Sequence, residues 1–424
     1  MAQYACTELK KREILSAMFL TIFIGLLGVG VVIPVTAPII LNNPSPVLPS
    51  TATFATRSLV LGLLISSYSV TQFFGAPMLG TLADRYGRKK MLLLSQLGTV
   101  AAYIVFAIGI VTGHLWMLFL GRMVDGFTGG NISIAQSIIS DISDPQDRAR
   151  NFGLVGVAFG IGFILGPIMG GVLANPRIVP WFGPATPFWF ATGLTAVATL
   201  LVQLLIPETL CFRSTARVNL FAGVANVRKA FTYANLRAFF SVVFLMTLGW
   251  NFFTQFFQVF LIAKFNFGAA QIGMFLGYLG IWIVIAQGGL LRPVSRRWHP
   301  SLVLRVALLL SGLTLPALLI PSQYGWLYAI VPFVAIFQGL SQPNATAIAS
   351  GLATREEQGE ILGINQSITS LGQAIPPIIA GIITSININL PIAVGAATTL
   401  LAWAMFMVLC VRNKTCAEAE PVSR

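Results

Sequence analysis

Two opposite charges lie one helical turn apart inside an apolar stretch of the chain. Arg122 and Asp125 occur in LGRMVDGFTGGN, residues 120–131, although charged residues make up only 9% of the sequence. In general, burial disfavours a charged carboxylate and a neighbouring cation stabilises it, so the protonation of such a group responds to its surroundings. The pattern indicates either proton exchange at Asp125 or a buried ion pair that only fixes the helix.

The composition predicts an all-α protein embedded in a membrane. The chain has 424 residues, of which 56% are hydrophobic, and its mean hydropathy is +0.82. A helix needs roughly 20 apolar residues to cross the core of a bilayer. The sequence contains twelve such runs, which we predict to be transmembrane helices: 14–41, 58–83, 91–112, 115–140, 151–174, 187–206, 236–263, 271–291, 301–320, 326–350, 360–384 and 390–411. The first run is too long for the apolar part of a signal peptide, so we interpret it as the first span.

The positive charges predict the orientation of these helices. If the N-terminus is cytoplasmic, 22 of the 26 Lys and Arg residues fall on the cytoplasmic side. Three fall outside (Arg57, Arg177 and Lys264), and Arg122 lies within the membrane. Cytoplasmic loops of membrane proteins carry such an excess of basic residues. We therefore predict a plasma (inner) membrane protein with both termini in the cytoplasm, and we interpret the net charge of +13 as topology rather than a sign of nucleic-acid binding.

The residues that usually carry enzymatic or metal chemistry are scarce. The four cysteines fall at or near the predicted cytoplasmic face, where thiols stay reduced: Cys6, Cys211, Cys410 and Cys416. The two histidines, His114 and His299, lie in loops on opposite sides of the membrane. The chain also lacks the G-x-x-x-x-G-K-[S/T] loop that binds ATP. We expect no enzyme activity, no metal and no cofactor, and an ion gradient as the energy source.

The two halves of the sequence resemble one another at an offset of 210 residues. Several glycine and proline positions recur at this offset: Gly153, Gly162, Pro167 and Gly171 fall on Gly363, Gly372, Pro377 and Gly381. A shared membrane-helix composition would instead give matches at scattered offsets. We predict a six-helix bundle at 1–206, a cytoplasmic linker at 207–235, and a second six-helix bundle with a short cytoplasmic tail at 236–424. Transporters built from two repeats bind their substrate between them near the middle of the bilayer.

The stretch GTLADRYGRKK, which follows the second predicted helix, resembles the G-x-x-x-D-R-x-G-R-R/K signature of the major facilitator superfamily. The resemblance implies the fold of that family, with two bundles of six helices. It also implies a cytoplasmic gate, in which the Asp contacts the positive N-terminal end of a helix in the opposite bundle. The residues assigned to the gate in this way are Gly80, Asp84, Arg85, Gly87, Arg88 and Asp141. Simple anchoring of the loop would explain the bases but not the Asp and the glycines.

Two further motifs resemble those of the proton-driven drug antiporters within this superfamily. GRMVDGFTGGNISIAQSIISD is similar to their fourth-helix motif, and GIGFILGPIMGG to the G-x-x-x-G-P-x-x-G-G signature of their fifth helix. Glycines at such spacing let a neighbouring backbone approach closely, and a proline frees a carbonyl and bends the helix. The residues of this antiporter motif are Gly162, Gly166, Pro167, Gly170 and Gly171.

Within the antiporters, the chain looks most similar to the tetracycline-efflux carriers. Three short segments resemble the sequences of those carriers: DRARNFG after the fourth predicted helix, PET after the sixth, and REEQGEILG before the eleventh. Two departures argue against tetracycline as the substrate. Gly25 stands where those carriers have a carboxylate, and the ninth predicted helix has no acidic residue. A drug that travels as a metal chelate would lack these ligands.

Asp125 is the one acidic residue of the thirteen that the predicted spans place deep in the membrane. From the outer end of its helix, a rise of about 1.5 Å per residue places Arg122 roughly 10 Å and Asp125 roughly 15 Å inside. The second half has Pro332 and Ala335 at the corresponding positions, so the fold does not require the charges. A buried ion pair rarely adds stability over apolar packing. We therefore favour proton coupling by Asp125, with Arg122 stabilising its charged form.

Uncharged polar residues among aromatic ones indicate the substrate. At 100° per residue, Gly129, Ser133, Gln136 and Ser140 share the helical face of Arg122 and Asp125. The predicted substrate-binding residues are Ser133, Gln136, Asn251, Gln255, Gln258, Gln338, Gln342 and Gln366. Amides amid phenylalanines suit a small organic compound that is largely apolar or cationic. Hydrogen bonding between helices is the alternative explanation for these amides.

These patterns predict a proton-coupled exporter that works by alternating access. Its partners would be a small-molecule substrate, protons and the lipid bilayer, and we expect a monomer. One alternative is an importer or facilitator of a metabolite on the same fold. Another is a receptor-like membrane protein that transports nothing.

Overall fold

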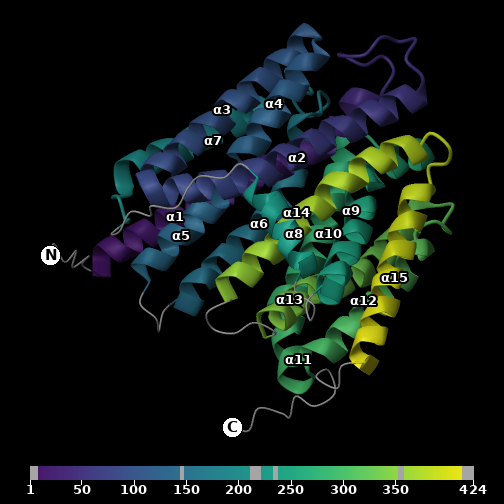
Figure 1. Ribbon diagram of the computed structural model, residues 1–424. Helices are drawn as coiled ribbons and strands as arrows, with labels where there is room; N and C mark the ends of the chain where they lie inside the picture. Colours follow the sequence, from purple (N-terminus) through teal and green to yellow (C-terminus); the bar gives the residue numbers. More distant parts are fainter. Residues whose placement is uncertain (1–7, 144–147, 211–220, 233–236, 352–357, 413–424) are drawn as a thin grey trace. The chain divides into compact units, whose positions relative to one another are not determined.

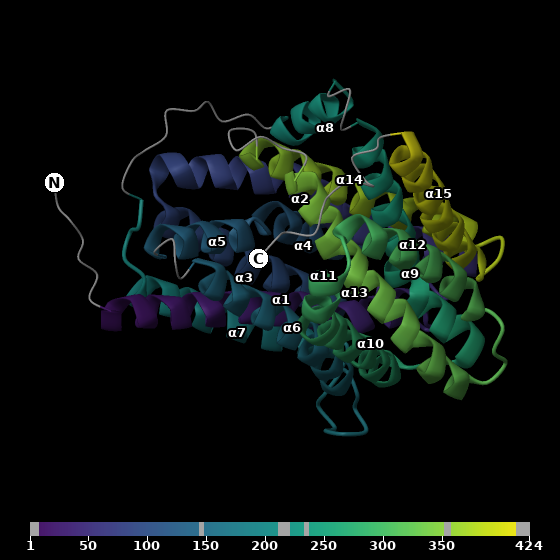
Figure 2. The same ribbon diagram turned by 90° about the horizontal axis from the view of Figure 1, so that it is seen from below.

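The regular elements in the described part of the chain are all helices (Figure 1, Figure 2). The computed structural model describes residues 8–143, 148–210, 221–232, 237–351 and 358–412. Ten helices of this part are long and apolar enough to cross a membrane. Inside a bilayer the backbone has no water to bond with, so an apolar segment satisfies its N–H and C=O groups within its own helix. The predicted all-α membrane fold is confirmed.

The helices of the first half of the sequence overlap the predicted spans. Their bounds are α1 (Glu8–Leu41), α2 (Phe54–Tyr86), α3 (Arg88–Thr112), α4 (Leu115–Thr128), α5 (Asn131–Ile142), α6 (Arg148–Leu173) and α7 (Thr186–Leu205). Gly87, between α2 and α3, has a φ of 115°, which only glycine adopts without strain. The end of α2 and the start of α3 are therefore joined by a turn of a single residue.

The second half has the same kind of helices, with shorter elements between them. Their bounds are α8 (Ala222–Thr232), α9 (Arg237–Phe265), α10 (Ala269–Val284), η1 (Ile285–Leu290), α11 (Leu291–Arg297), α12 (Pro300–Ala317), η2 (Tyr324–Trp326), α13 (Leu327–Gly351), α14 (Gln358–Ile383) and α15 (Leu390–Arg412). η1 is a π-helix, and α10, η1 and α11 form one helical run of 29 residues. The predicted span 271–291 is therefore part of a longer helix. α8 lies within the predicted linker.

The fourth predicted span, 115–140, is wrong as a single helix, because the structure divides it into α4 and α5. The N–H of Gly129 bonds to the carbonyl of Gly126, three residues back instead of four, which tightens the end of α4. The consecutive glycines at 129–130 also weaken the helix locally. Close packing against α2 requires a small residue here, since a Cβ at Gly130 would lie 3.2 Å from the Cα of Ala76.

The chain forms two compact units whose boundaries differ from the halves of the sequence. Unit 1 consists of residues 1–50, 70–222 and 269–277, and unit 2 of residues 51–69, 223–268 and 278–424. The start of α2 thus belongs to unit 2, and the start of α10 to unit 1. The division into bundles at 1–206 and 236–424 with a linker at 207–235 stays a prediction.

Each unit has its own apolar core. In unit 1, α1 packs against α6 and α7, and α3 packs against α4 and α7. Met18 and Ile138 are fully buried in its core. In unit 2, α9 packs against α14 and α15, and α12 packs against α13 and α15. Phe240 is fully buried there, next to the almost fully buried Phe406.

Candidate functional site

Arg122 and Asp125 form a buried but loosely held ion pair on α4. The Nη1 atom of Arg122 lies 3.6 Å from Oδ2 of Asp125, a distance at which charges attract without a hydrogen bond. Asp125 is only 4% exposed, and its Oδ2 atom has no hydrogen-bond partner among the described residues. The side chain of Arg122 is 13% exposed. The arginine is therefore the more exposed member of the pair.

Asp125 lies on the side of α4 that packs against α3. One turn before it, a Cβ at Gly121 would lie 2.8 Å from the carbonyl oxygen of Ala102 on α3. One turn after it, the hydroxyl of Thr128 is 3.2 Å from that of Thr99, also on α3. Residues three and four apart share a helical face, so the carboxylate is enclosed between these two helices.

The helix predicted to carry a polar face over residues 122–140 is interrupted at 129–130. Ser133 is exposed on α5, and its hydroxyl donates a hydrogen bond to the carbonyl of Gly130, 2.7 Å away. Gln136 is half-buried one turn later. The 100° spacing applies within α4 and within α5, and two residues of turn separate them. Ser133 and Gln136 stay predicted substrate residues.

A cluster of charged and polar side chains joins four segments of unit 1 at the end predicted to be cytoplasmic. We call Asp84, Arg88, Asp141, Glu208 and Thr209 the charge cluster. Nη1 of Arg88 lies 3.1 Å from Oδ1 of Asp84, and its Nε lies 2.5 Å from Oδ2 of Asp141. The hydroxyl of Thr209 donates to the same Asp141 oxygen at 3.1 Å. The ends of α2 and α5, the start of α3 and the segment after α7 are therefore linked through one guanidinium and its partners.

Glu208 caps the start of α3. Its Oε1 atom accepts hydrogen bonds from the backbone N–H of Arg88, at 2.9 Å, and of Leu210, at 3.1 Å. The N–H groups of a first helical turn have no partner within the helix, and a carboxylate also stabilises the positive end of the helix dipole. A Cβ at Gly87 would overlap the carboxylate of Glu208. Gly87 is thus required twice, by its backbone angle and by the space that Glu208 occupies.

Glu208 and Thr209 are absent from the residues predicted for the gate. The one signal for them in the sequence is the PET tripeptide after the sixth predicted helix. That signal has no recognisable chemistry by itself, because Glu208 acts on a backbone group 120 residues earlier in the chain. The contact between the two segments depends on the packing of α7 against α3.

Two other predicted gate residues, Gly80 and Arg85, lie outside the charge cluster. The guanidinium of Arg85 stacks on the ring of Tyr86 at 5.4 Å. Within the described residues, nothing lies within 4 Å of a Cβ placed at Gly80. No described helix therefore packs closely against Gly80 in this conformation. The side chain of Asp84 is 47% exposed, and its contact with the end of a helix in the opposite bundle stays a prediction.

The antiporter motif on α6 makes the close backbone approach that its glycines predict. A Cβ at Gly162 would lie 2.8 Å from the Cβ of Leu26, and one at Gly166 would lie 2.8 Å from the Cα of Gly30. A Cβ at Gly170 would overlap the carbonyl of Val31. These three glycines, four residues apart, form one stripe of α6 against α1.

The neighbouring side of α6 packs against the start of α10 in the same unit. A Cβ at Gly171 would lie 2.7 Å from the carbonyl oxygen of Ala269, and one at Gly273 would overlap the carbonyl of Pro167. The carbonyl of Pro167 therefore faces a residue without a side chain. The motif brings two helices from different halves of the sequence onto α6.

The predicted amides of α9 bond mainly to their own helix. Nδ2 of Asn251 donates to the carbonyl of Thr247 at 2.8 Å, and Nε2 of Gln255 donates to Oδ1 of Asn251 at 3.4 Å. Nε2 of Gln258 donates to the carbonyl of Gln255 at 3.3 Å, while Oε1 of Gln258 is buried without a partner in the described structure. The amides follow one another along the helix among buried phenylalanines.

The other amides predicted for substrate binding lie on α13 and α14. Gln338 and Gln342 are half-buried on α13, and Gln366 is exposed on α14. These residues and those of α9 stay predictions as substrate ligands. Within the described residues, no group of three or more His, Cys, Asp or Glu side chains is placed to hold a metal ion.

The sequence matches the family model of the Major Facilitator Superfamily over residues 18–334 and 239–422. The chain belongs to the major facilitator superfamily. It is 29% identical to the class C tetracycline resistance protein of Escherichia coli, over 88% of this chain and 89% of that protein. It is also 29% identical to multidrug resistance protein 1 of Bacillus subtilis (strain 168), over 93% of this chain and 97% of that protein. Its fold is similar to the solved structure of the human organic anion transporter MFSD10, with a TM-score of 0.70 at 21% identity. The match covers 93% of this chain and 99% of that protein.

As a member of the major facilitator superfamily, the chain is a multi-pass membrane transporter of small molecules and not an enzyme. The resemblance to drug-efflux carriers that the motifs indicate is confirmed by the tetracycline and multidrug resistance proteins among its relatives.

The glycine stripe of α6 predicts a matched pair of variants. Gly166→Val places a branched side chain against Gly30 and is expected to cost about 1–3 kcal/mol of stability, as overpacking does. Gly156→Val on the same helix meets no described atom within 4 Å and should leave the melting temperature of the purified protein unchanged. Equal melting temperatures for both variants would contradict the assigned packing.

The cap at the start of α3 predicts a second pair. Glu208→Ala removes the acceptor for two backbone N–H groups and is expected to cost about 1 kcal/mol, the usual value for a helix cap. Glu13→Ala removes an exposed carboxylate of the same charge on α1 and should have no such effect. Thermal unfolding in detergent measures both. A loss as large for Glu13→Ala would show that net charge, and not the cap, determines the result.

Proposed function

We propose that this carrier exports a small organic compound, largely apolar or cationic, in exchange for protons by alternating access. The observation that carries the proposal is the buried Asp125 carboxylate, 3.6 Å from Arg122 and with one oxygen lacking a hydrogen bond. The tetracycline and multidrug resistance proteins among the relatives support export as the direction. The carrier would act as a monomer in the plasma (inner) membrane, with both termini in the cytoplasm.

The geometry of the pair supports proton exchange better than a structural role. A buried ion pair stabilises a protein only when good geometry and further hydrogen bonds offset the loss of hydration. Here the pair is longer than a hydrogen bond, and the corresponding positions of the second half, Pro332 and Ala335, carry no charge. Ala335 is fully buried, so a helix at this depth packs well without a carboxylate.

In the proposed cycle, Asp125 binds a proton in one conformation and releases it in the other. Arg122 stabilises the charged carboxylate, and the side chain of Arg122 is the more exposed member of the pair. A change in the packing of α4 against α3 would alter both the burial of the carboxylate and its distance from the guanidinium. Either change shifts the balance between its two protonation states.

The charge cluster provides the proposed inner gate. Its ion pairs involve Arg88, Asp84 and Asp141 within unit 1, and no described residue lies within 4 Å of a Cβ placed at Gly80. We infer that a helix packs against Gly80 when the gate closes and that Asp84 then exchanges its contact with Arg88 for the positive end of that helix.

The surroundings of Gly25 support a substrate other than a metal chelate. The tetracycline-efflux carriers that the sequence resembles have a carboxylate at this position. Here a Cβ at Gly25 would lie 3.9 Å from the amide nitrogen of Asn131, a neutral group. Together with the amides and phenylalanines of α9, this favours a ligand that needs no metal.

Asp125→Asn tests the proposal directly. In liposomes containing the purified carrier, with a ligand chosen by thermal shift, an imposed pH gradient should drive accumulation by the wild type. The variant should fall to the level of protein-free liposomes, since it has no proton to exchange, while still exchanging ligand without a gradient. Glu13→Gln is the matched control, because it neutralises an exposed carboxylate. Full coupling in Asp125→Asn would refute the mechanism.

The same assay separates the alternative functions. Accumulation on the side that loses protons indicates exchange, and thus export. Accumulation of the ligand on the side that gains protons would indicate an importer. Ligand transport that does not depend on the pH gradient would indicate a facilitator. A receptor-like protein would bind ligands and move none of them.

A further inference from the structure

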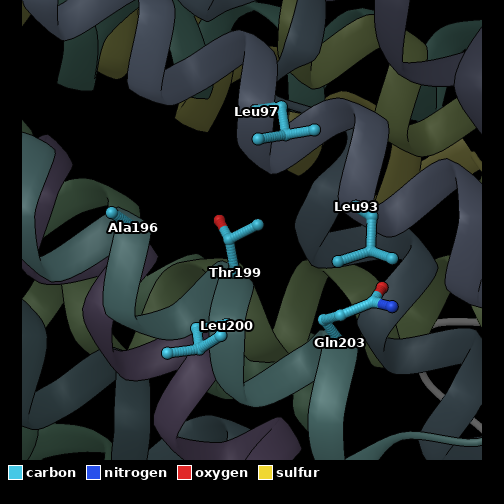
Figure 3. A pocket seen from close by; sticks show the side chains of 6 residues that line it. All are labelled: Leu93, Leu97, Ala196, Thr199, Leu200 and Gln203. Carbon is cyan, nitrogen blue, oxygen red and sulfur yellow. The ribbon is translucent and has the colours of Figure 1, made fainter.

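A groove runs between α3 and α7 on unit 1 (Figure 3). Leu93 and Leu97 line it from α3. Four residues line it from α7: Ala196, Thr199, Leu200 and Gln203. The groove has a volume of about 340 Å³. Its walls are mainly aliphatic, with a hydroxyl and an amide on the α7 side.

The groove lies within one half of the membrane. α3 begins at Arg88 and α7 ends at Leu205, and the two helices pack against each other. A rise of about 1.5 Å per residue places Leu93 and Gln203 roughly 8 and 3 Å from these ends, and Leu97 and Ala196 roughly 14 Å from them. The hydrocarbon core is about 30 Å thick, so the groove spans the leaflet next to the 84–90 loop. The predicted orientation makes this the cytoplasmic leaflet.

The side chains around the groove are suited to lipid. Leu94 on α3 and Leu204 on α7 are exposed apolar residues beside it, and Leu97 and Leu200 within it are exposed as well. In a multi-pass membrane protein such an exposed apolar surface faces acyl chains. A groove in that surface holds a chain more closely than a flat helix face does.

Positive charge lies at the loop end of the groove. The ammonium group of Lys89 donates a hydrogen bond to the carbonyl of Gln203, at 2.8 Å, and so lies against a lining residue. Lys90 is exposed next to it.

The carboxylates at this end are bound by other groups. Asp84 and Asp141 pair with Arg88, and Glu208 caps α3. The two lysines therefore leave positive charge at the end of the groove, where a lipid phosphate would lie.

We propose that the groove binds one anionic glycerophospholipid, with an acyl chain between α3 and α7 and its phosphate on Lys89 and Lys90. Lysine ammonium groups bind phosphate as compact charges, and the cytoplasmic leaflet is the one rich in anionic lipid. The bound lipid would join the start of α3 to the end of α7, next to the Glu208 cap. The proposal rests on membrane embedding and not on the proposed transport cycle, so each can fail alone.

Native mass spectrometry with phosphatidylglycerol and phosphatidylcholine in equal amounts tests this site. The wild type should retain the first phosphatidylglycerol about tenfold better than phosphatidylcholine, as expected for two lysines near an anionic headgroup. K89Q/K90Q should bind both lipids equally. Ala196→Trp should fill the groove and lose the first lipid. Val197→Trp, the adjacent exposed residue that does not line the groove, should bind like the wild type.

Three results would overturn the proposal. Equal retention of both lipids by the wild type would show that the lysines do not select an anionic lipid. A preference of K89Q/K90Q for phosphatidylglycerol would show the same. Equal binding by Ala196→Trp and Val197→Trp shows that the lipid lies elsewhere. Melting temperatures without added lipid should match for the two tryptophan variants, which separates loss of the site from loss of the fold.

Discussion

The structure depends on close backbone contacts between helices, because the hydrophobic effect does not drive helices together inside a bilayer. Lipid chains are as apolar as leucine, so helices in a bilayer are held by packing and by interhelical polar contacts. Gly166 and Gly30 bring α6 and α1 so close that a Cβ on either would lie within 3 Å of the other glycine's Cα. A larger residue at either position would separate the two helices along the whole stripe.

The same kind of contact occurs twice, on two prolines related by the internal repeat. In unit 1, Gly273 packs on the carbonyl of Pro167, and in unit 2, Gly62 packs on the carbonyl of Pro377. Pro167 and Pro377 are 210 residues apart, the offset of the repeat. Each contact joins segments from both halves of the sequence within one unit, which is why the compact units do not coincide with the sequence halves.

The charged residues fall into two environments with different physical consequences. In the charge cluster, Arg88 has two carboxylate partners, and the side chain of one of them, Asp84, is 47% exposed, so that this ion pair can form and separate at small cost. Asp125 is buried, and its one cationic partner, Arg122, lies beyond hydrogen-bonding distance. A change in its burial or in its distance from Arg122 therefore has a large effect on whether the carboxylate is charged. The first arrangement suits a gate, and the second suits the binding of a proton.

The sequence by itself determined the membrane fold, most of the helix positions, the family, and Asp84, Arg88 and Asp141 of the charge cluster, because hydropathy and short motifs act locally. It placed Arg122 and Asp125 on one helix for the same reason. Tertiary structure alone decided that Asp125 faces α3, that Thr209 joins the charge cluster, and that Glu208 caps a helix begun 120 residues earlier. These features arise from contacts between helices distant in sequence, and no periodicity within one segment encodes which neighbour a given face will meet.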